Sequence, residues 1–128
     1  MALQVGATSS ESFAVGQEHT ALAMGNEGVS VLGTPALILF AETVCHRMLV
    51  PHLADGDASV GIAVNIRHLK ATPVGMRVQV SATLREIAGR RHLFEVSGQD
   101  EEGAILAGTH ERAIVDLAPF LAKIEVAR

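Results

Sequence analysis

The chain has 128 residues, enough for one domain with a modest core, and 48% of them are hydrophobic. Ten basic and fourteen acidic residues give a net charge of −4, and there is no Trp or Tyr. These values exclude a disordered chain and argue against nucleic acid or an anionic membrane as a partner. The sequence has no signal-peptide or membrane-span pattern, and its single Cys45 cannot form an internal disulfide. We therefore expect a cytoplasmic protein.

The first predicted elements are a strand and a loop. The strand falls between residues 11 and 22, with Phe13, Val15 and His19 in it, and residues 1–10 are expected to be a loose start. Three glycines within residues 24–33 predict a flexible loop that leads into the next element.

Residues 33–51 predict one long central helix. Thr34 is a suitable N-cap, Pro35 suits the first turn, and Pro51 ends the segment. Residues 36–41 are apolar all round, so we expect this helix to be buried on most sides.

The second half of the chain alternates between apolar and polar residues, which predicts consecutive strands joined by tight turns. A short terminal helix is expected over residues 116–126. The predicted strands are residues 59–71, 76–87, 91–99 and 104–115. This order indicates a single α+β domain spanning residues 1–128: an antiparallel sheet of about five strands wrapped around one long helix, the hotdog fold. Its open sheet edges favour edge-to-edge dimerisation.

Glu42 is the first candidate site residue, because it interrupts the apolar wall of the central helix. A carboxylate in such a place is costly unless it is paired or hydrogen-bonded, and perturbed carboxylates gather at working sites. The alternative is structural: Glu42 faces a solvent crevice or packs at a dimer seam.

His68 and Thr34 are the next candidates. His68 continues the face formed by Ile62, Val64 and Ile66, which should look at the helix, so an imidazole and the carboxylate of Glu42 would converge. A core histidine without a catalytic role is the alternative. Thr34 lies eight residues before Glu42, about 12 Å along a helix. Both residues can serve one substrate only if the turn at Thr34 folds back or if two protomers contribute, which favours a dimer seam.

The last strand places His110 and Arg112 on one side. Arg112 would neutralise an anionic ligand or pair with a carboxylate, and a solvated strand charge is the alternative. His46 and His52 are six residues apart without a third partner, so no metal site is predicted. The residues around Gly61 form no phosphate-binding loop, and no cofactor is predicted.

Several motifs together are similar to those of a known family. The chain resembles the fluoroacetyl-coenzyme A thioesterase group of hotdog-fold thioesterases over about residues 30–125. The spacing of Thr34, Glu42 and His68 matches that family's Thr/Glu/His catalytic set. The other matching stretches are residues 67–75, 86–91 and 108–113.

The resemblance implies an acyl-CoA thioesterase with its catalytic set at a dimer-interface cleft. Gly61 would lie close to the acyl group, and Arg112 near the pocket mouth, as substrate-binding positions. The selective family member carries bulky Phe side chains in the loop before its Thr. Here that loop has Gly25, Gly28 and Leu32, so a different or broader acyl range is expected.

The expected reaction is hydrolysis of a short or medium acyl thioester of coenzyme A by a homodimer, with a tetramer left open. Glu42 is either the nucleophile or the general base on water, His68 orients or protonates, and Thr34 hydrogen-bonds. Two alternatives remain: an acyl-CoA hydratase or dehydratase on the same fold, and a non-catalytic dimeric acyl-binding module.

Overall fold

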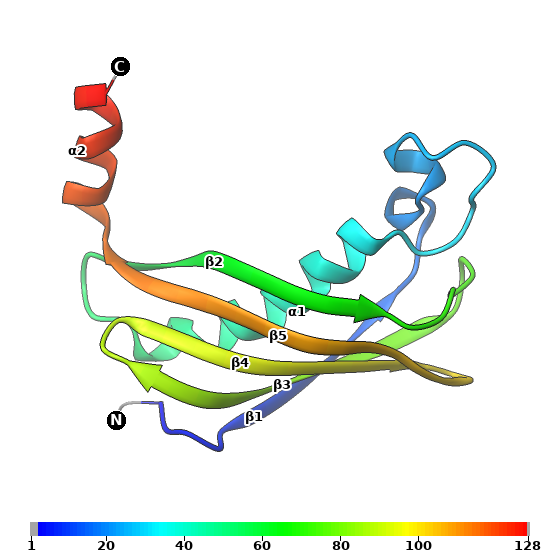
Figure 1. Cartoon of the computed structure of the whole chain (residues 1–128), viewed down its shortest axis with the longest axis horizontal. Helices are drawn as coiled ribbons and strands as arrows, with labels where there is room; N and C mark the ends of the chain where they lie inside the picture. Colours follow the sequence, from blue (N-terminus) through cyan, green and yellow to red (C-terminus); the bar gives the residue numbers. More distant parts are fainter. Residues whose placement is uncertain (1–2, 128) are drawn as a thin grey trace.

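The computed structural model describes residues 3–127, which form a five-stranded antiparallel sheet, one long helix and a C-terminal helix (Figure 1). The strands lie in the order β1-β3-β4-β5-β2. The bounds are β1 Thr8–Ala14, α1 Thr34–Leu49, β2 Asp57–His68, β3 Arg77–Ala88, β4 Arg91–Asp100, β5 Gly103–Asp116 and α2 Leu117–Ala127. This confirms the predicted α+β hotdog architecture.

The N-cap of helix α1 lies one residue earlier than predicted. Gly33, in extended conformation, is the N-cap, because its carbonyl accepts the first intrahelical hydrogen bonds from Ala36 and Leu37. The prediction of Thr34 as N-cap was therefore wrong. Thr34 is the first helical residue, and its hydroxyl is used elsewhere. The helix gives way to a 3₁₀ turn, Val50–His52, which contains Pro51 as expected.

The core lies between α1 and the inner face of the sheet. Alternate residues of β3 and β4 are buried there against one side of the helix. The largest fully buried side chains include Leu37, Leu84 and Phe94. The apolar sequence of this helix predicted burial on most sides. The structure differs, since Leu39 is 55% exposed. The outer side of α1 is therefore exposed in a single protomer.

The first strand was misplaced by the prediction. β1 pairs with residues 77–83 of β3 and ends at Ala14. It begins at Thr8, within residues 1–10, which were expected to be a loose start. Beyond it, the backbone N–H of Gly16 donates a 3.0 Å hydrogen bond to Nδ1 of His19 and closes a 3₁₀ turn. His19 thus belongs to a turn, because a local side-chain hydrogen bond replaces the sheet pairing.

Strand β2 forms one edge of the sheet and contains an irregularity. Its pairing with β5 shifts between Gly61 and Ala63, so that Gly61, rather than Ile62, lies opposite Arg112. The prediction that Ile62 shares one face with Val64, Ile66 and His68 was therefore wrong for Ile62. The other three residues keep a common face. Ile62 and Val64 are 48% and 42% exposed on this edge.

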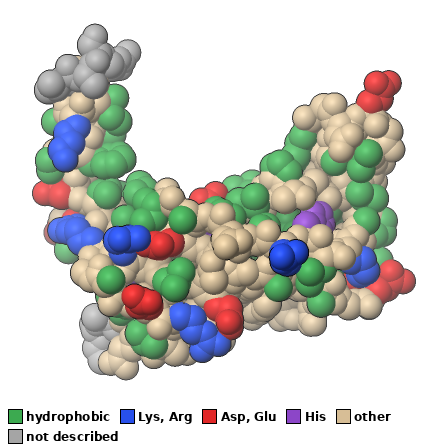
Figure 2. Space-filling model, in the orientation of Figure 1, with side chains coloured by type: hydrophobic (Ala, Val, Ile, Leu, Met, Phe, Trp, Pro, Cys, Tyr) green, Lys and Arg blue, Asp and Glu red, His purple; other side chains and the backbone are tan. Residues whose placement is uncertain are grey.

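Two projections give the molecule a hollowed upper surface. Helix α2 stands away from the sheet at one end, and the segment around residues 17–30 rises at the other (Figure 1). Hydrophobic side chains gather on α2 and along the hollow between the projections (Figure 2). The exposed apolar residues of α2 are Leu117, Phe120, Leu121 and Ile124. Within residues 3–127, no helix has the length and apolar character needed to cross a membrane.

Candidate active site

Glu42 lies at the meeting point of α1, β2 and β5. Its Oε1 is 3.5 Å from Nη1 of Arg112 and 3.7 Å from Nε2 of His110. The side chain of Glu42 is 37% exposed, whereas Arg112 and His110 are 6% and 1% exposed. The carboxylate of Glu42 is therefore paired with a buried cation and is still accessible at the surface. A group in this position can contact a ligand.

A buried network fixes Arg112 beneath the carboxylate. Its Nε donates to Oγ of Ser59 at 2.7 Å, and its Nη2 donates to the Ser59 carbonyl at 3.1 Å. Nη1 lies 3.1 Å from Nε2 of His110. Because a guanidinium only donates, Nε2 must accept, and Nδ1 of His110 then donates to the carbonyl of Ala63 at 2.9 Å. Burial lowers the pKa of His110, which agrees with a neutral ring. Arg112 is thus not a solvated strand charge but a buried cation that pairs with Glu42 and lines a cavity together with it.

Gly61 leaves the space that Glu42 occupies. A Cβ at this position would lie 2.4 Å from Oε1 of Glu42, 3.2 Å from Cε1 of His110 and 3.3 Å from Nη1 of Arg112. Any side chain would displace the carboxylate. The absence of a side chain at Gly61 therefore lets the carboxylate of Glu42 pack against the backbone of β2.

Cys45 also lies close to this group but is not available as a nucleophile. It is fully buried, and burial raises the pKa of its thiol to about 12, against the opposing effect of the Arg112 cation. The prediction of a small buried hydrophobe is confirmed.

Thr34 and His68 form a second group, at the start of α1 and the end of β2. The Thr34 hydroxyl and Nδ1 of His68 are hydrogen-bonded at 2.8 Å. The Nε2 atom of His68 is buried and has no hydrogen-bond partner in the described part of the chain. Burial lowers the pKa of His68, although a backbone hydrogen bond at Lys70 acts in the opposite direction. A neutral imidazole with one open nitrogen is suited to proton transfer.

The two groups open into separate cavities of one protomer. A cavity of about 430 Å³ is lined by Thr34, His68, Lys70 and the segment around residues 26–33. Another, of about 330 Å³, is lined by Glu42, Thr43, His46, Arg47 and Arg112. No residue lines both. The predicted convergence of Glu42 and His68 therefore does not occur within one protomer, since eight helical residues separate Thr34 from Glu42 by about 12 Å.

Sequence reasoning missed the full role of two histidines. His110 was placed beside Arg112, but its contact with Glu42 was not expected. Its position on the face shared with Arg112 was the available signal. His46 was considered only as a metal ligand, although its spacing of four residues from Glu42 puts both on one helix face. Among residues 3–127, no three His, Cys, Asp or Glu side chains are arranged to hold a metal ion.

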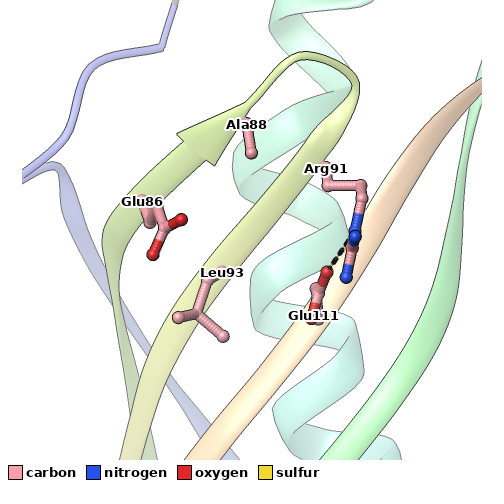
Figure 3. A pocket seen from close by; sticks show the side chains of 5 residues that line it. All are labelled: Glu86, Ala88, Arg91, Leu93 and Glu111. Atoms are coloured by element: carbon pink, nitrogen blue, oxygen red, sulfur yellow. Dashed lines mark hydrogen bonds and ion pairs between the residues drawn. The ribbon is translucent and has the colours of Figure 1, made fainter.

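A further depression lies on the opposite, outer face of the sheet, with α1 behind it (Figure 3). It measures about 160 Å³ and is lined by Glu86, Ala88, Arg91, Leu93 and Glu111. Nε of Arg91 contacts Glu111 at 2.6 Å, so this charge pair is already satisfied. The depression contains none of the candidate residues.

Comparisons with known proteins agree on one family. The family model FlK, fluoroacetyl-CoA-specific thioesterase, matches residues 15–118. A fluoroacetyl-CoA thioesterase from Streptantibioticus cattleyicolor is 40% identical over 94 residues, which cover 73% of this chain and 68% of that protein.

Solved structures give the same result. A crystal structure of a variant of the fluoroacetyl-CoA-specific thioesterase FlK has a TM-score of 0.94 and 33% identity, covering 100% of this chain and 99% of its own. Another, in complex with fluoroacetate and CoA, has a TM-score of 0.89 and 34% identity over 92% and 99%. A thioesterase superfamily member from Thermus thermophilus has a TM-score of 0.88 and 26% identity over 97% and 92%.

Proposed function

The chain belongs to the fluoroacetyl-CoA-specific thioesterase family, and from this premise we propose that it hydrolyses a short or medium acyl thioester of coenzyme A at a site completed by two protomers. It is an acyl-CoA thioesterase on a hotdog fold. One observation supports the proposed site above all. Within one protomer, Thr34 and His68 line one cavity, and Glu42 lines another.

The exposed edge of β2 supports a homodimer. Ile62 and Val64 are exposed there, and apolar residues of α2 stand at one end of the hollow (Figure 2). Antiparallel pairing of two β2 edges, centred on Val64 and Asn65, would bring His68 beside Gly61 of the partner subunit. Because Gly61 lies against Glu42, the same pairing brings the two halves of the site together. We leave a tetramer as the alternative assembly.

The chemistry then follows from the two groups. Glu42, held by Arg112, acts either as the nucleophile or as general base on water. Addition to the thioester carbonyl and cleavage of the carbon–sulfur bond release the carboxylic acid and coenzyme A. With the Thr34 hydroxyl donating to Nδ1 of His68, Nε2 carries the ring proton and can donate a hydrogen bond to the sulfur of the leaving thiolate. The thiolate then takes up the proton that Glu42 has removed from water. The reaction needs water and no cofactor.

The acyl range is proposed to differ from that of the fluoroacetyl-specific relatives. The loop over residues 24–33 contains no Phe, and it lines the cavity of Thr34 and His68 with Asn26, Val29 and Val31. A loop without aromatic side chains closes less tightly over a two-carbon acyl group, which leaves room for longer chains. We also propose that residues 1–128 act as one domain and that the protein works in the cytoplasm, where a thiol such as Cys45 stays reduced.

The test is a thiol-release assay with CoA thioesters of increasing acyl length, fluoroacetyl-CoA included, on the native protein and on Glu42→Ala. We expect turnover on short or medium chains and a loss of at least about a hundredfold in the variant. An unchanged rate in Glu42→Ala would remove Glu42 from the mechanism. Hydration of an enoyl-CoA without thiol release would favour a hydratase, and tight binding without turnover would favour an acyl-binding module.

A further inference from the structure

We propose that His46 selects acyl groups that carry a neutral oxygen, a hydroxyl or an oxo group, beyond the thioester carbonyl. This inference rests on the proposed function, because it assigns a substrate class to the same site. It starts from the position of His46 on the cavity wall and from the atom there that lacks a partner.

His46 and Glu42 share one wall of the smaller cavity. They lie four residues apart on α1, so their side chains project from the same helix face. Both line the cavity of about 330 Å³, together with Thr43, Arg47 and Arg112. An acyl chain whose carbonyl carbon is at Glu42 can therefore run along the helix to His46.

The other polar groups of this wall are already engaged. The Thr43 hydroxyl donates to a carbonyl of its own helix at 2.7 Å, and Arg47 is paired with a carboxylate of β1. Arg112 is held by its buried network and by Glu42. His46 differs, because its Nδ1 has no hydrogen-bond partner among residues 3–127. The atom has almost no exposed surface, so a rotation of the ring about the Cβ–Cγ bond brings it to the cavity before a ligand can pair with it. A buried polar atom without a partner is costly, and a ligand that supplies one is favoured.

The chemistry of the wall defines the ligand group. Burial lowers the pKa of His46, and the cations of Arg112 and Arg47 act in the same direction, so the ring is neutral near pH 7. A neutral imidazole pairs with a hydroxyl or a carbonyl oxygen. An acyl chain ending in a carboxylate would meet Glu42 without a free cation, and a purely apolar chain would leave Nδ1 unpaired.

The spacing favours an oxygen near the thioester. Four helical residues separate Glu42 from His46 by about 6 Å along the axis, and a hydrogen bond covers about 3 Å of that distance. An oxygen on the third carbon of the acyl chain fits this gap. The substrate class is therefore a short 3-hydroxyacyl or 3-oxoacyl thioester.

The test compares butanoyl-CoA with 3-hydroxybutanoyl-CoA, which differ by one hydroxyl. For the native protein we expect kcat/KM to be about tenfold higher with the hydroxyacyl substrate. His46→Leu should remove this preference by lowering the hydroxyacyl value only. His46→Asn, whose amide lies near the position of Nδ1, should keep part of it, and His46→Gln, whose amide reaches further, should not. Thermal unfolding of each variant checks the fold.

Two results would overturn the inference: equal kcat/KM for both substrates in the native protein, or a preference that survives in His46→Leu. If neither thioester is hydrolysed, the proposed function fails, and calorimetric binding of the same two thioesters still decides the inference. A Kd for 3-hydroxybutanoyl-CoA about tenfold lower, dependent on His46, supports it, and equal Kd values sink it. If His46→Leu does not fold, the contrast between the Asn and Gln variants carries the test.

Discussion

The hydroxyl of Thr34 and Nδ1 of His68 lie 2.8 Å apart, although 34 residues separate them along the chain. Thr34 opens α1 and His68 closes β2, so the contact joins the helix to the sheet edge. The contact fixes the imidazole ring and leaves Nε2 as the ring nitrogen without a hydrogen-bond partner in the described part of the chain. This residue pair is one half of the proposed site.

Replacing Thr34 tests whether this contact positions His68. Thr34→Val keeps the shape and removes the hydroxyl, so we expect kcat to fall by about ten- to a hundredfold with a small change in KM. Thr34→Ser is the matched control and should retain most of the activity. Steady-state thiol release measures both. Equal rates for the Val and Ser variants would show that the hydroxyl has no role.

Mixing two inactive variants tests whether the site is shared between protomers. Glu42→Ala and His68→Ala remove different halves of the site. If each site takes Glu42 from one protomer and His68 from the other, a heterodimer contains one intact site. Refolding the two together at equal amounts should then restore about a quarter of native activity, since half of the dimers are mixed.

The contrary outcome of that experiment is equally clear. If Glu42 and His68 served the same site from one protomer, neither site of a heterodimer would be intact, and the mixture would stay inactive. A mixture of Glu42→Ala with Thr34→Val provides a second pairing, because Thr34 belongs to the half that contains His68.

The sequence predicted most of the architecture because the signals were local. Period-two alternation in residues 76–87 and tight turns at Gly89 and Gly103 determine the two hairpins, and the structure confirms them. The turn at Gly75 joins β2 to β3, which do not pair with each other. The β1 error has a different cause. Alternation favoured residues beyond Ala14, but the hydrogen bond from Gly16 to His19 takes the chain out of the sheet.

The sequence singled out the candidate residues of the proposed site but not their grouping. Glu42 stood out as a charge in an apolar segment, and His68 as the polar end of an apolar face. Their separation depends on the length of α1 and on the assembly, which no local pattern contains. The role of Gly61 depends on the irregularity of β2 between Gly61 and Ala63, a long-range feature of the pairing with β5.

Gly61→Ala tests the packing of Glu42. The added Cβ would come within 2.4 Å of Oε1, so the carboxylate must leave its position against Arg112. We expect activity to fall by at least about tenfold while the fold is retained, because the atom that the added Cβ meets first is the end of a flexible side chain. In a Glu42→Ala background the same change should cost nothing further. An additive loss in the double variant would show that Gly61 acts independently of Glu42.

The last prediction concerns Asp100, whose carboxylate joins two segments near the Thr34–His68 cavity. Oδ2 accepts hydrogen bonds from Lys70 at 2.6 Å and from the Thr72 hydroxyl at 2.8 Å. Burial alone would raise the pKa of Asp100, but these contacts and the N–H of Glu102 hold it at about 2. The carbonyl of Thr72 in turn accepts from the N–H of Leu32, close to the start of α1. Asp100 therefore stabilises the loop that positions His68 and Thr34.

Replacing this carboxylate should affect stability in a pH-dependent way. Asp100→Asn should lower the free energy of unfolding by about 1–3 kcal/mol at neutral pH, because charge-assisted hydrogen bonds are lost. The folded pKa of Asp100 lies below its unfolded value, so its contribution is present above about pH 4 and disappears as the pH falls towards 2. Urea unfolding from pH 7 to pH 3 should therefore show the native and Asn proteins converging. Glu102→Gln, an exposed carboxylate in the same turn, is the control and should change stability little. A difference between native protein and Asp100→Asn that stays constant over this range would mean that the ionised carboxylate does not stabilise the loop.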